Sequence, residues 1–471
     1  MHSSSQGESV RVIVVGAGIT GLLMARRLTA AGIDATVLEA SGRWGGQVHT
    51  IEFEGHPVDV GAEAIHLGIP AVKKLVTELG LADRVVPAEP GSSWLATRKG
   101  LRPLPAGVGP AGPTRIRPVL DSRILSVKGL ARAGLEPLLA RRTRTTDDIS
   151  VGAFLRSRFG DEVTDTFVDP LLGNLHSGDI DRLSLQSTAP QLLGKVRDGA
   201  SMLPLGRRKK PARPAGAAAP VSLFSSFPTG LRELTDALAE GLDVRLTTRV
   251  TALSVDGDQW VVDTEHGQER AQAVVLTGPA RLAGDLLDPL RPGVADDLAR
   301  GRAADVATVV LAFLADEPCD LLDHANGLLL TSRSGRLLKA VTNLSRKWDH
   351  VFDPQLHIIR ASVGRAGADT VNQMTDEQLV RIVTDELHEI AGTPTTVHAS
   401  HVERWPGAMP QLEVGHSERM RRVRGRLDGL PPIVLAGAFF DGLGVGSTVK
   451  SAEAHATELI SLNASMRTEQ S

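Results

Sequence analysis

The beginning of the chain carries a pattern that fixes the order of its first structural elements. Residues 10–15 are an apolar run, Val-Arg-Val-Ile-Val-Val, which predicts a buried strand. A turn follows that has glycine at three positions, Gly16, Gly18 and Gly21. Residues 22–28 then predict a helix, and residues 34–39 predict a second strand that ends in Glu39. This order of strand, glycine turn, helix, strand and acid is typical of a doubly wound α/β domain of the Rossmann type.

Each glycine of the turn has a separate physical role in such a domain. Gly16 permits the tight turn, Gly18 lets the backbone approach a pyrophosphate, and Gly21 lets the helix pack closely on the strand. The helix N-terminus offers free N–H groups and a partial positive charge to phosphates. Glu39 can accept hydrogen bonds from both ribose hydroxyls. The pattern predicts a dinucleotide site, and the alternative is a glycine-rich turn without a ligand.

The residues after Glu39 favour one class of cofactor. Arg43, Gly45 and Gly46 place a cation and two glycines directly behind the ribose acid. This extension is typical of flavin-dependent oxidases and is not expected in an NAD dehydrogenase. Arg43 can pair with a cofactor phosphate. The alternative for Arg43 alone is a solvated surface arginine.

Composition excludes several classes of protein. The 471 residues carry 52 Lys and Arg against 55 Asp and Glu, a net charge of −3, which argues against a nucleic-acid partner. Cys319 is the single cysteine, so no intramolecular disulfide or multi-cysteine metal site can form, and we expect no metal. The sequence contains no secretory pattern and no apolar run of the ~18–20 residues that a membrane span needs. We therefore expect a cytoplasmic protein without a membrane span.

Later segments complete a coarse map of the chain. Residues 121–200 predict mainly helices, and residues 206–220 are basic and low in complexity, which predicts a flexible surface loop. The alternative for this loop is a peripheral contact with phosphate or anionic lipid. Further strands are predicted at residues 244–246, 249–255, 260–264 and 273–276. The chain closes with a second strand, glycine loop and helix, at residues 433–436, 437–449 and 450–462.

These segments together resemble one family. The motifs that carry the resemblance are residues 12–46, Val-Asp-Val-Gly-Ala-Glu-Ala at 58–64, Arg-Phe-Gly-Asp-Glu-Val at 158–163, Val-Asp-Pro-Leu-Leu-Gly at 168–173, and Arg-Trp-Pro-Gly-Ala-Met-Pro-Gln at 404–411. They resemble the FAD-dependent protoporphyrinogen and coproporphyrinogen III oxidases, within the flavin amine-oxidase superfamily. The Gly-Ala-Glu-Ala segment is similar to the actinobacterial branch, which is associated with oxidising coproporphyrinogen III to coproporphyrin III in heme biosynthesis.

The resemblance implies an α/β fold with three parts. The implied FAD-binding domain is Rossmann-like and discontinuous, over residues 1–70, 221–280 and 431–471. A mixed-sheet substrate-binding domain covers residues 71–110 and 281–430. A helical domain covers residues 111–205, followed by the flexible basic loop at 206–220.

The resemblance also implies the cofactor, the co-substrate and the site residues. FAD is the cofactor, and dioxygen accepts the electrons as hydrogen peroxide. The implied FAD contacts are Gly16, Gly18, Gly21, Glu39, Arg43, Gly46, Val250, Trp405, Gly437, Asp441, Gly446 and Val449. The residues expected to bind the porphyrinogen are Arg98, Lys99, Arg102, Asn174 and His176. Trp405 is expected beside the isoalloxazine, and the loop at 441–448 near its pyrimidine end.

The chain departs from the family pattern near the expected pocket. An aromatic residue usually follows the central glycine, whereas residues 173–178 here are Gly-Asn-Leu-His-Ser-Gly. The family's Met-Pro-Gln-Tyr is Met-Pro-Gln-Leu at residues 409–412. These changes leave the substrate open. The alternatives are a related flavoenzyme that oxidises another small molecule in specialised metabolism, an amine oxidase, and a flavin-binding protein without activity.

The chemistry of a porphyrinogen does not demand a strong base on the protein, because the conjugated pyrroles stabilise the cation left by hydride loss. The sequence offers no obvious catalytic triad or pair of carboxylates. His176 is the one candidate base in the expected pocket, and a lining role is its alternative. The sequence therefore predicts catalysis by positioning, exclusion of water and tuning of the flavin.

Overall fold

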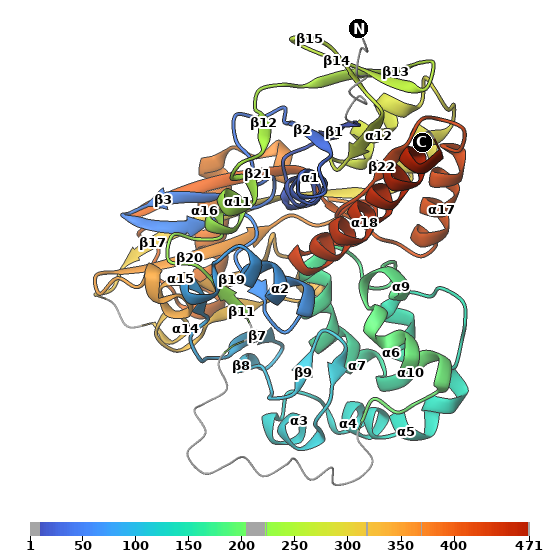
Figure 1. Cartoon of the computed structure of the whole chain (residues 1–471). Helices are drawn as coiled ribbons and strands as arrows, with labels where there is room; N and C mark the ends of the chain where they lie inside the picture. Colours follow the sequence, from blue (N-terminus) through green and yellow to red (C-terminus); the bar gives the residue numbers. More distant parts are fainter. Residues whose placement is uncertain (1–9, 204–221, 223, 317–318, 369, 470–471) are drawn as a thin grey trace, which may run out of the picture.

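The first predicted strand lies at the centre of a parallel sheet (Figure 1). A computed structural model gives the structure of residues 10–203, 222, 224–316, 319–368 and 370–469. The five strands follow the order β12 (Asp243–Arg245), β2 (Asp34–Leu38), β1 (Arg11–Val15), β16 (Ala273–Leu276) and β22 (Ile433–Leu435). All four pairings are parallel. Strands that are more than 400 residues apart in the chain thus form one sheet, as the discontinuous domain requires.

The strands of the parallel sheet are apolar at consecutive positions, so each strand has apolar side chains on both faces of the sheet. Other elements cover both faces. Val12 and Val14 pack on one face, and Ile13 and Val15 pack on the other. The first face is covered by α1 (Ile19–Ala30), α2 (Pro70–Glu78), α11 (Arg232–Ala239) and α18 (Val445–Glu469). The second face is covered by β13 (Val250–Asp256), β14 (Gln259–Thr264), β15 (Gly267–Ala271), α12 (Ala280–Leu287), α13 (Val294–Ala299) and α17 (His416–Arg426). The Rossmann-like architecture is confirmed.

A second sheet of seven strands forms the other large layer. Its order is β21 (Ala399–Pro410), β17 (Ala303–Leu314), β20 (Leu356–Val363), β19 (Leu338–Asn343), β18 (Gly327–Leu329), β7 (Ser93–Thr97) and β8 (Gly100–Pro103). The pair β18 and β7 is parallel and the other pairs are antiparallel, so the sheet is mixed, as predicted. Helices α14 (Asp320–His324) and α16 (Asp376–Ala391) pack on one face. The hairpin of β3 (Thr50–Phe53) and β4 (His56–Asp59) packs on the other face, with α15 (Leu344–Lys347).

Residues 116–198 form the helical unit, with its own core of leucine, valine and phenylalanine side chains. Its helices are α3 (Ile116–Ser122), α4 (Val127–Gly134), α5 (Glu136–Leu139), α6 (Val151–Phe159), α7 (Asp161–Val163), α8 (Asn174–His176), α9 (Leu185–Thr188) and α10 (Leu193–Asp198). A π-helix, Thr164–Gly173, contains Pro170 and leads directly into α8. The side chains of Leu95 and Leu329 from the second sheet join this core. The helical unit therefore packs against the end of that sheet where β7 and β18 lie.

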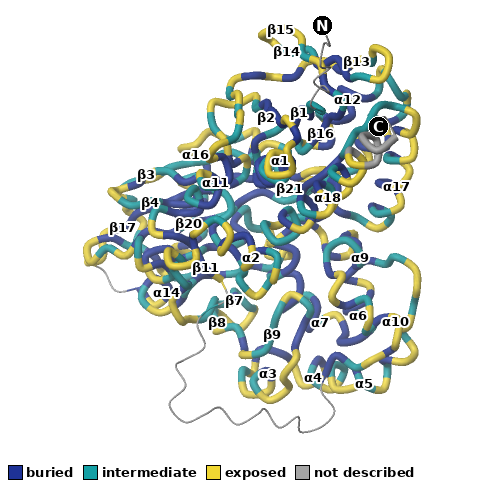
Figure 2. Tube along the Cα trace, in the orientation of Figure 1, coloured by how far each residue is buried: buried dark blue, intermediate teal, exposed yellow. Residues whose placement is uncertain are grey.

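Several segments pack differently from the division implied by the resemblance. Helix α2, which lies within residues 71–110 except for its first residue, packs on the parallel sheet through Val72 and Leu75. Helices α12, α13 and α17, which lie within residues 281–430 except for the first residue of α12, also pack on the parallel sheet. The basic segment 206–220 lies outside the described residues. Figure 2 shows buried positions along the strands of both sheets, with exposed positions on the outer turns. In the described part of the chain, no helix is long and apolar enough to cross a membrane.

Candidate active site

The glycine turn after β1 has the geometry that its sequence predicts. Gly16 has a φ of +105°, which an L-residue rarely adopts. A Cβ on Gly21 would overlap the carbonyl oxygen of Gly16, so only glycine lets α1 approach the turn. Gly18 has extended backbone angles, and nothing lies within 4 Å of the place where its Cβ would be. The turn is therefore tight at Gly16 and Gly21 and open at Gly18.

The acid at the end of β2 lies against this turn. The Oε2 atom of Glu39 accepts a hydrogen bond from the Ala17 backbone N–H at 2.8 Å, and Oε1 accepts one from the Ser41 N–H at 2.8 Å. The Thr248 N–H donates to the Glu39 carbonyl at 2.8 Å, which holds the chain before β13 beside this acid. Val250, the first residue of β13, is buried. The structure thus brings Glu39 and the start of β13 to the glycine turn.

A second glycine segment closes over the first. Gly45 forms a bridge with Gly18, and a Cβ on Gly46 would lie 3.2 Å from the Gly18 Cα. Arg43 donates from Nη1 to the Gly46 carbonyl at 3.0 Å, and its guanidinium carbon lies 6.0 Å from the centre of the Trp405 ring. Arg43 therefore holds its own loop and reaches toward β21. Pairing with a cofactor phosphate stays a prediction.

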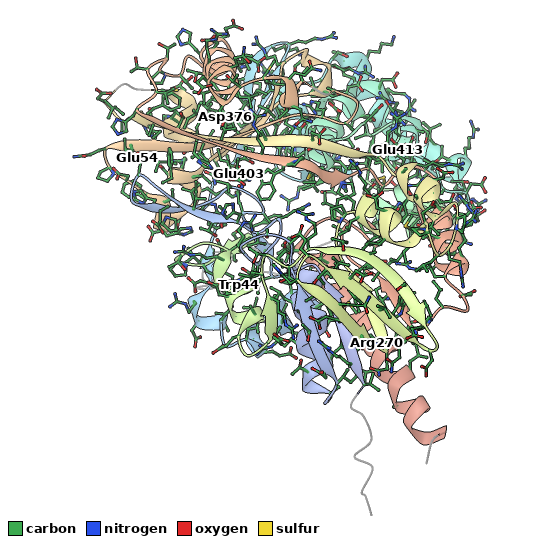
Figure 3. The ribbon with its side chains drawn as sticks, turned by 90° about the horizontal axis from the view of Figure 1, so that it is seen from above. Trp44, Glu54, Arg270, Asp376, Glu403 and Glu413 are labelled. Atoms are coloured by element: carbon green, nitrogen blue, oxygen red, sulfur yellow. The ribbon has the colours of Figure 1, made fainter. Side chains whose placement is uncertain are left out.

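Trp405 occupies the junction between the two sheets. Its Nε1–H donates to the Val60 carbonyl at 3.2 Å. A Cβ on Gly61 would lie 3.2 Å from the Trp405 ring and would overlap the Gln47 carbonyl oxygen. Figure 3 shows this junction from above, with Trp44 on the side of the parallel sheet and Glu403 of β21 on the side of the second sheet. The predicted position of Trp405 beside the isoalloxazine stays a prediction.

The C-terminal glycine loop joins the same region from the other end of the chain. Gly437 has a φ of +107°, and its Cβ would lie 3.0 Å from the Thr20 hydroxyl of α1. Asp441 accepts hydrogen bonds from the Gly437 N–H at 3.1 Å and from the Ser451 hydroxyl at 2.6 Å. Burial opposes ionisation of Asp441, but hydrogen bonds from His455 and Ser451 outweigh it and lower its pKa to about 2.

Two residues of the second glycine unit serve packing. A Cβ on Gly446 would overlap the Ile69 side chain, and Val449 is fully buried against α1 and its neighbours. Gly446 and Val449 thus pack on protein side chains, and their contact with FAD stays a prediction. Three glycine segments from distant parts of the chain meet at one place, with room at Gly18 and an acid at the end of β2. The residues fit a dinucleotide such as FAD.

A buried ionic cluster next to Trp405 was missed by sequence reasoning. Glu63 pairs with Lys347 and Arg360, and Arg360 also donates to the Asp59 and Gly61 carbonyls at 2.8 Å each. Burial would raise the pKa of Glu63, but the two cations outweigh it and lower the pKa to about 2. The cluster ties the segment that contacts Trp405 to β20 and α15. The members of this cluster are far apart in the sequence, so their contact is not visible there. The one available signal was a glutamate inside the otherwise small and apolar segment Gly-Ala-Glu-Ala.

The two predicted substrate residues of the helical unit lie where that unit meets the second sheet. Asn174 donates from Nδ2 to the Leu330 and Lys339 carbonyls, at 3.0 and 2.7 Å, and its Oδ1 accepts from Arg365 at 2.7 Å. His176 is buried, and burial lowers its pKa to about 4. The structure brings these two residues together with two cations, Lys339 and Arg365, that sequence reasoning also missed. A lysine inside the apolar run Leu-Leu-Lys-Ala-Val was the available signal.

The three predicted substrate cations lie elsewhere. Arg98, Lys99 and Arg102 are exposed on the hairpin of β7 and β8, and Lys99 donates to the Arg123 carbonyl at 2.8 Å. Strand β8 is the edge opposite β21, so six strand spacings, about 29 Å, separate it from the strand of Trp405. The structure does not bring these cations together with Trp405. Their contact with a substrate stays a prediction.

The family model for flavin-containing amine oxidoreductases matches residues 19–460, from α1 through α18. The chain belongs to this family. It is therefore an FAD-dependent oxidoreductase, and the convergent glycine segments are where this chain would hold the cofactor. When bound, FAD supplies an acceptor for hydride.

Relatives with related names align along nearly the whole chain. The chain is 30% identical over 466 residues to a coproporphyrinogen III oxidase of Bacillus subtilis strain 168, covering 95% of this chain and 97% of that protein. It is 32% identical over 457 residues to one of Mycobacterium tuberculosis H37Rv, covering 95% and 96%. A solved structure of a candidate protoporphyrinogen oxidase from Exiguobacterium sp. 255-15 superposes with a TM-score of 0.83 at 28% identity, covering 96% and 99%. The resemblance seen in the sequence is confirmed.

Glu39 offers a direct test of the adenosine end of the site. In Glu39→Gln one oxygen remains to accept from Ala17, but the charge that a ribose hydroxyl would meet is lost. We expect FAD affinity to fall by about 1.5–3 kcal/mol, the usual value of a hydrogen bond to a charged group. Titration of apoprotein with FAD, followed by flavin fluorescence, measures this. Glu240→Gln, on an exposed position after α11, is the matched control and should bind FAD like the wild type. If Glu39→Gln binds FAD as tightly as Glu240→Gln does, Glu39 does not contact the cofactor.

Proposed function

We propose that the chain oxidises coproporphyrinogen III to coproporphyrin III in heme biosynthesis, with dioxygen as the electron acceptor. The observation that carries this proposal is the full-length match to relatives named coproporphyrinogen III oxidase. The convergence of the glycine segments with Trp405 supports it, because oxidation needs the substrate held against the flavin. A cytoplasmic site of action is part of the proposal, and a single buried cysteine is consistent with a reducing compartment.

The reaction balances as three rounds of two-electron oxidation. Conversion of a porphyrinogen to a porphyrin removes six hydrogen atoms, and three dioxygen molecules accept them as three molecules of hydrogen peroxide. In each round a bridging carbon of the substrate loses a hydride and a pyrrole N–H loses a proton. Tautomerisation moves one further hydrogen from a bridge to a nitrogen, so that over three rounds the bridges lose four hydrogens and the nitrogens lose two. Because the conjugated pyrroles stabilise the resulting cation, the protein's task is to position the substrate and exclude water.

The residues of the chain suit that task better than proton abstraction. His176 is buried, its pKa is lowered to about 4, and its Nδ1 atom has no hydrogen-bond partner among the described residues. A group with so low a pKa is a weak base near neutral pH. The π-helix and α8 hold His176 and Asn174 against β19, so these residues can line the substrate pocket.

Replacement of His176 by alanine should therefore leave turnover within about tenfold of the wild type, whereas loss of a required base typically costs ~10²–10⁴-fold. Initial rates at saturating porphyrinogen measure this effect, with flavin content and melting temperature checked in both proteins. His66→Ala serves as a comparison, because His66 follows the Gly-Ala-Glu-Ala segment and packs edge-on against Phe224. If His176→Ala loses turnover while keeping its flavin and fold, catalysis by positioning alone is wrong.

Turnover of coproporphyrinogen III by the purified holoenzyme tests the proposal. We expect red porphyrin fluorescence to appear together with three equivalents of hydrogen peroxide per porphyrin. Protoporphyrinogen serves as the comparison substrate. Absence of porphyrin, with release of ammonia and peroxide from an added amine, would instead support an amine oxidase. Absence of both activities in a flavin-loaded protein would favour a different small-molecule substrate.

A further inference from the structure

A buried lysine and a partly buried arginine lie together where the helical unit meets the second sheet. Lys339 is 2% exposed, and its ammonium group donates to the Ser177 hydroxyl. Arg365, directly after β20, donates from Nη1 to Asn174, while its Nη2 atom is buried and has no hydrogen-bond partner in the described part of the chain. Asn174 links the two, since it also donates to the Lys339 carbonyl. The cations therefore share one polar cluster.

This cluster has an unbalanced positive charge. No carboxylate of the described residues forms an ion pair with Lys339. Asp169 lies near Arg365, but its oxygens accept hydrogen bonds from Thr331 and Ser332. Buried charges are normally paired, because an unpaired charge in a protein interior is costly. An anion from outside the chain would supply the missing partner.

Irregular backbone positions lie at Lys339 and directly before Arg365. The pairing of β19 with β20 shifts register between Leu338 and Ala340, so Lys339 occupies a β-bulge. Bulges re-aim side chains and are frequent near active sites. Arg365 follows Gly364, whose φ of +91° turns the chain at the end of β20. The Ala366 N–H then donates to the Ser177 carbonyl at 2.7 Å, which holds the turn against α8.

We propose that Lys339 and Arg365, with the Ser177 hydroxyl, form a subsite that binds a carboxylate of the substrate, and that Asn174 positions Arg365 within it. This inference rests on the proposed function, because coproporphyrinogen III carries four propionates. It assigns carboxylate recognition to the junction of the helical unit with β19 and β20. The exposed hairpin of Arg98, Lys99 and Arg102 is the competing location.

The charge state of Lys339 should make carboxylate binding at the subsite depend on pH. Burial, together with the positive charges of Arg365 and Arg360, lowers the pKa of Lys339 to about 7. The neighbouring groups are Asp169 and His176 from the helical unit and Arg360 and Arg365 from β20 and its turn. His176 is neutral near pH 7, because burial lowers its pKa to about 4. A bound carboxylate favours the ammonium form, so its affinity should fall as pH rises from about 7 to 9.

Binding of coproporphyrin III to the holoenzyme, followed by porphyrin fluorescence, tests the subsite. We expect Lys339→Met and Arg365→Met each to weaken binding about 10–100-fold, the range for loss of a charged hydrogen bond. Both variants should bind coproporphyrin tetramethyl ester as the wild type does. The fall of affinity with pH should be absent from Lys339→Met. Lys73→Met makes the same change on the exposed face of α2 and should leave both affinities unchanged.

The outcomes separate this proposal from the proposed function. If the wild type oxidises coproporphyrinogen III but both variants bind coproporphyrin III as tightly as it does, the subsite is wrong and the function stands. Equal losses for the acid and its ester would also overturn the subsite, because they indicate a distorted pocket. If the wild type neither oxidises coproporphyrinogen III nor binds coproporphyrin III, both proposals fail. Arg365 is only partly buried, so Arg365→Met keeps the test valid should Lys339→Met not fold.

Discussion

Replacement of Glu136 by alanine should lower the free energy of unfolding by about 3–5 kcal/mol, the usual cost of removing one partner of a buried ion pair. The side chains of Glu136 and Arg158 are both fully buried in the helical unit, 3.1 Å apart. Glu136 also accepts hydrogen bonds from the Met202 N–H at 3.1 Å and the Ser201 hydroxyl at 2.5 Å. The variant would leave the Arg158 guanidinium beside the Phe154 ring without its carboxylate partner. The Met202 N–H and the Ser201 hydroxyl would also lose the acceptor that Glu136 provides.

Urea unfolding of the holoenzyme, followed by circular dichroism, measures this loss. Arg117→Ala breaks an exposed pair with Asp121 whose side chains are 92% and 71% exposed, and it should change stability by less than about 1 kcal/mol. The double variant Glu136→Leu with Arg158→Met removes both charges and should recover much of the stability. A loss below 1 kcal/mol in Glu136→Ala would show that solvent reaches this pair.

The sequence predicts the cofactor half of the molecule well because its signals are local. The spacing of Gly16, Gly18 and Gly21 determines a turn within six residues, and the structure shows the predicted tight turn at Gly16 and the predicted close packing at Gly21. The strand predicted at residues 273–276 is β16, and the apolar run at residues 10–15 contains β1. Strand β15 was missed because Gly-Gln-Glu-Arg-Ala is polar, and pairing with β14 forms it.

The substrate half depends on contacts between distant residues, which one sequence does not reveal. Lys339 and Ser177 are 162 residues apart, and Glu63 and Lys347 are 284 apart. A buried charge looks like a surface charge in sequence unless its neighbours are known. The same limitation explains why Arg102 was predicted to bind the substrate. Its strand was expected near the pocket, but in the structure that strand, β8, forms the exposed edge of the second sheet.

Alanine at Gly21 should destabilise the apoprotein and alanine at Gly18 should not, although both should impair FAD binding. The Gly18 backbone, at φ −73° and ψ 177°, is one that alanine adopts freely, and a Cβ there meets no protein atom within 4 Å. A Cβ on Gly21 would overlap the Gly16 carbonyl oxygen and lie 3.1 Å from the Thr277 hydroxyl. Relief of that overlap requires α1 to move away from the turn.

We therefore expect Gly21→Ala to lower the stability of the apoprotein by about 1–3 kcal/mol, the usual cost of overpacking, and to lose FAD through distortion of the turn. Gly18→Ala should keep the apoprotein within about 0.5 kcal/mol of the wild type. Its FAD affinity should still fall by about 1–3 kcal/mol, because the added methyl group occupies the space through which the pyrophosphate approaches Gly18. Melting of the apoproteins and titration with FAD separate the two effects. Wild-type FAD affinity in Gly18→Ala would mean that the pyrophosphate lies elsewhere. A large loss of apoprotein stability in that variant would mean that the open space beside Gly18 is not formed before FAD binds.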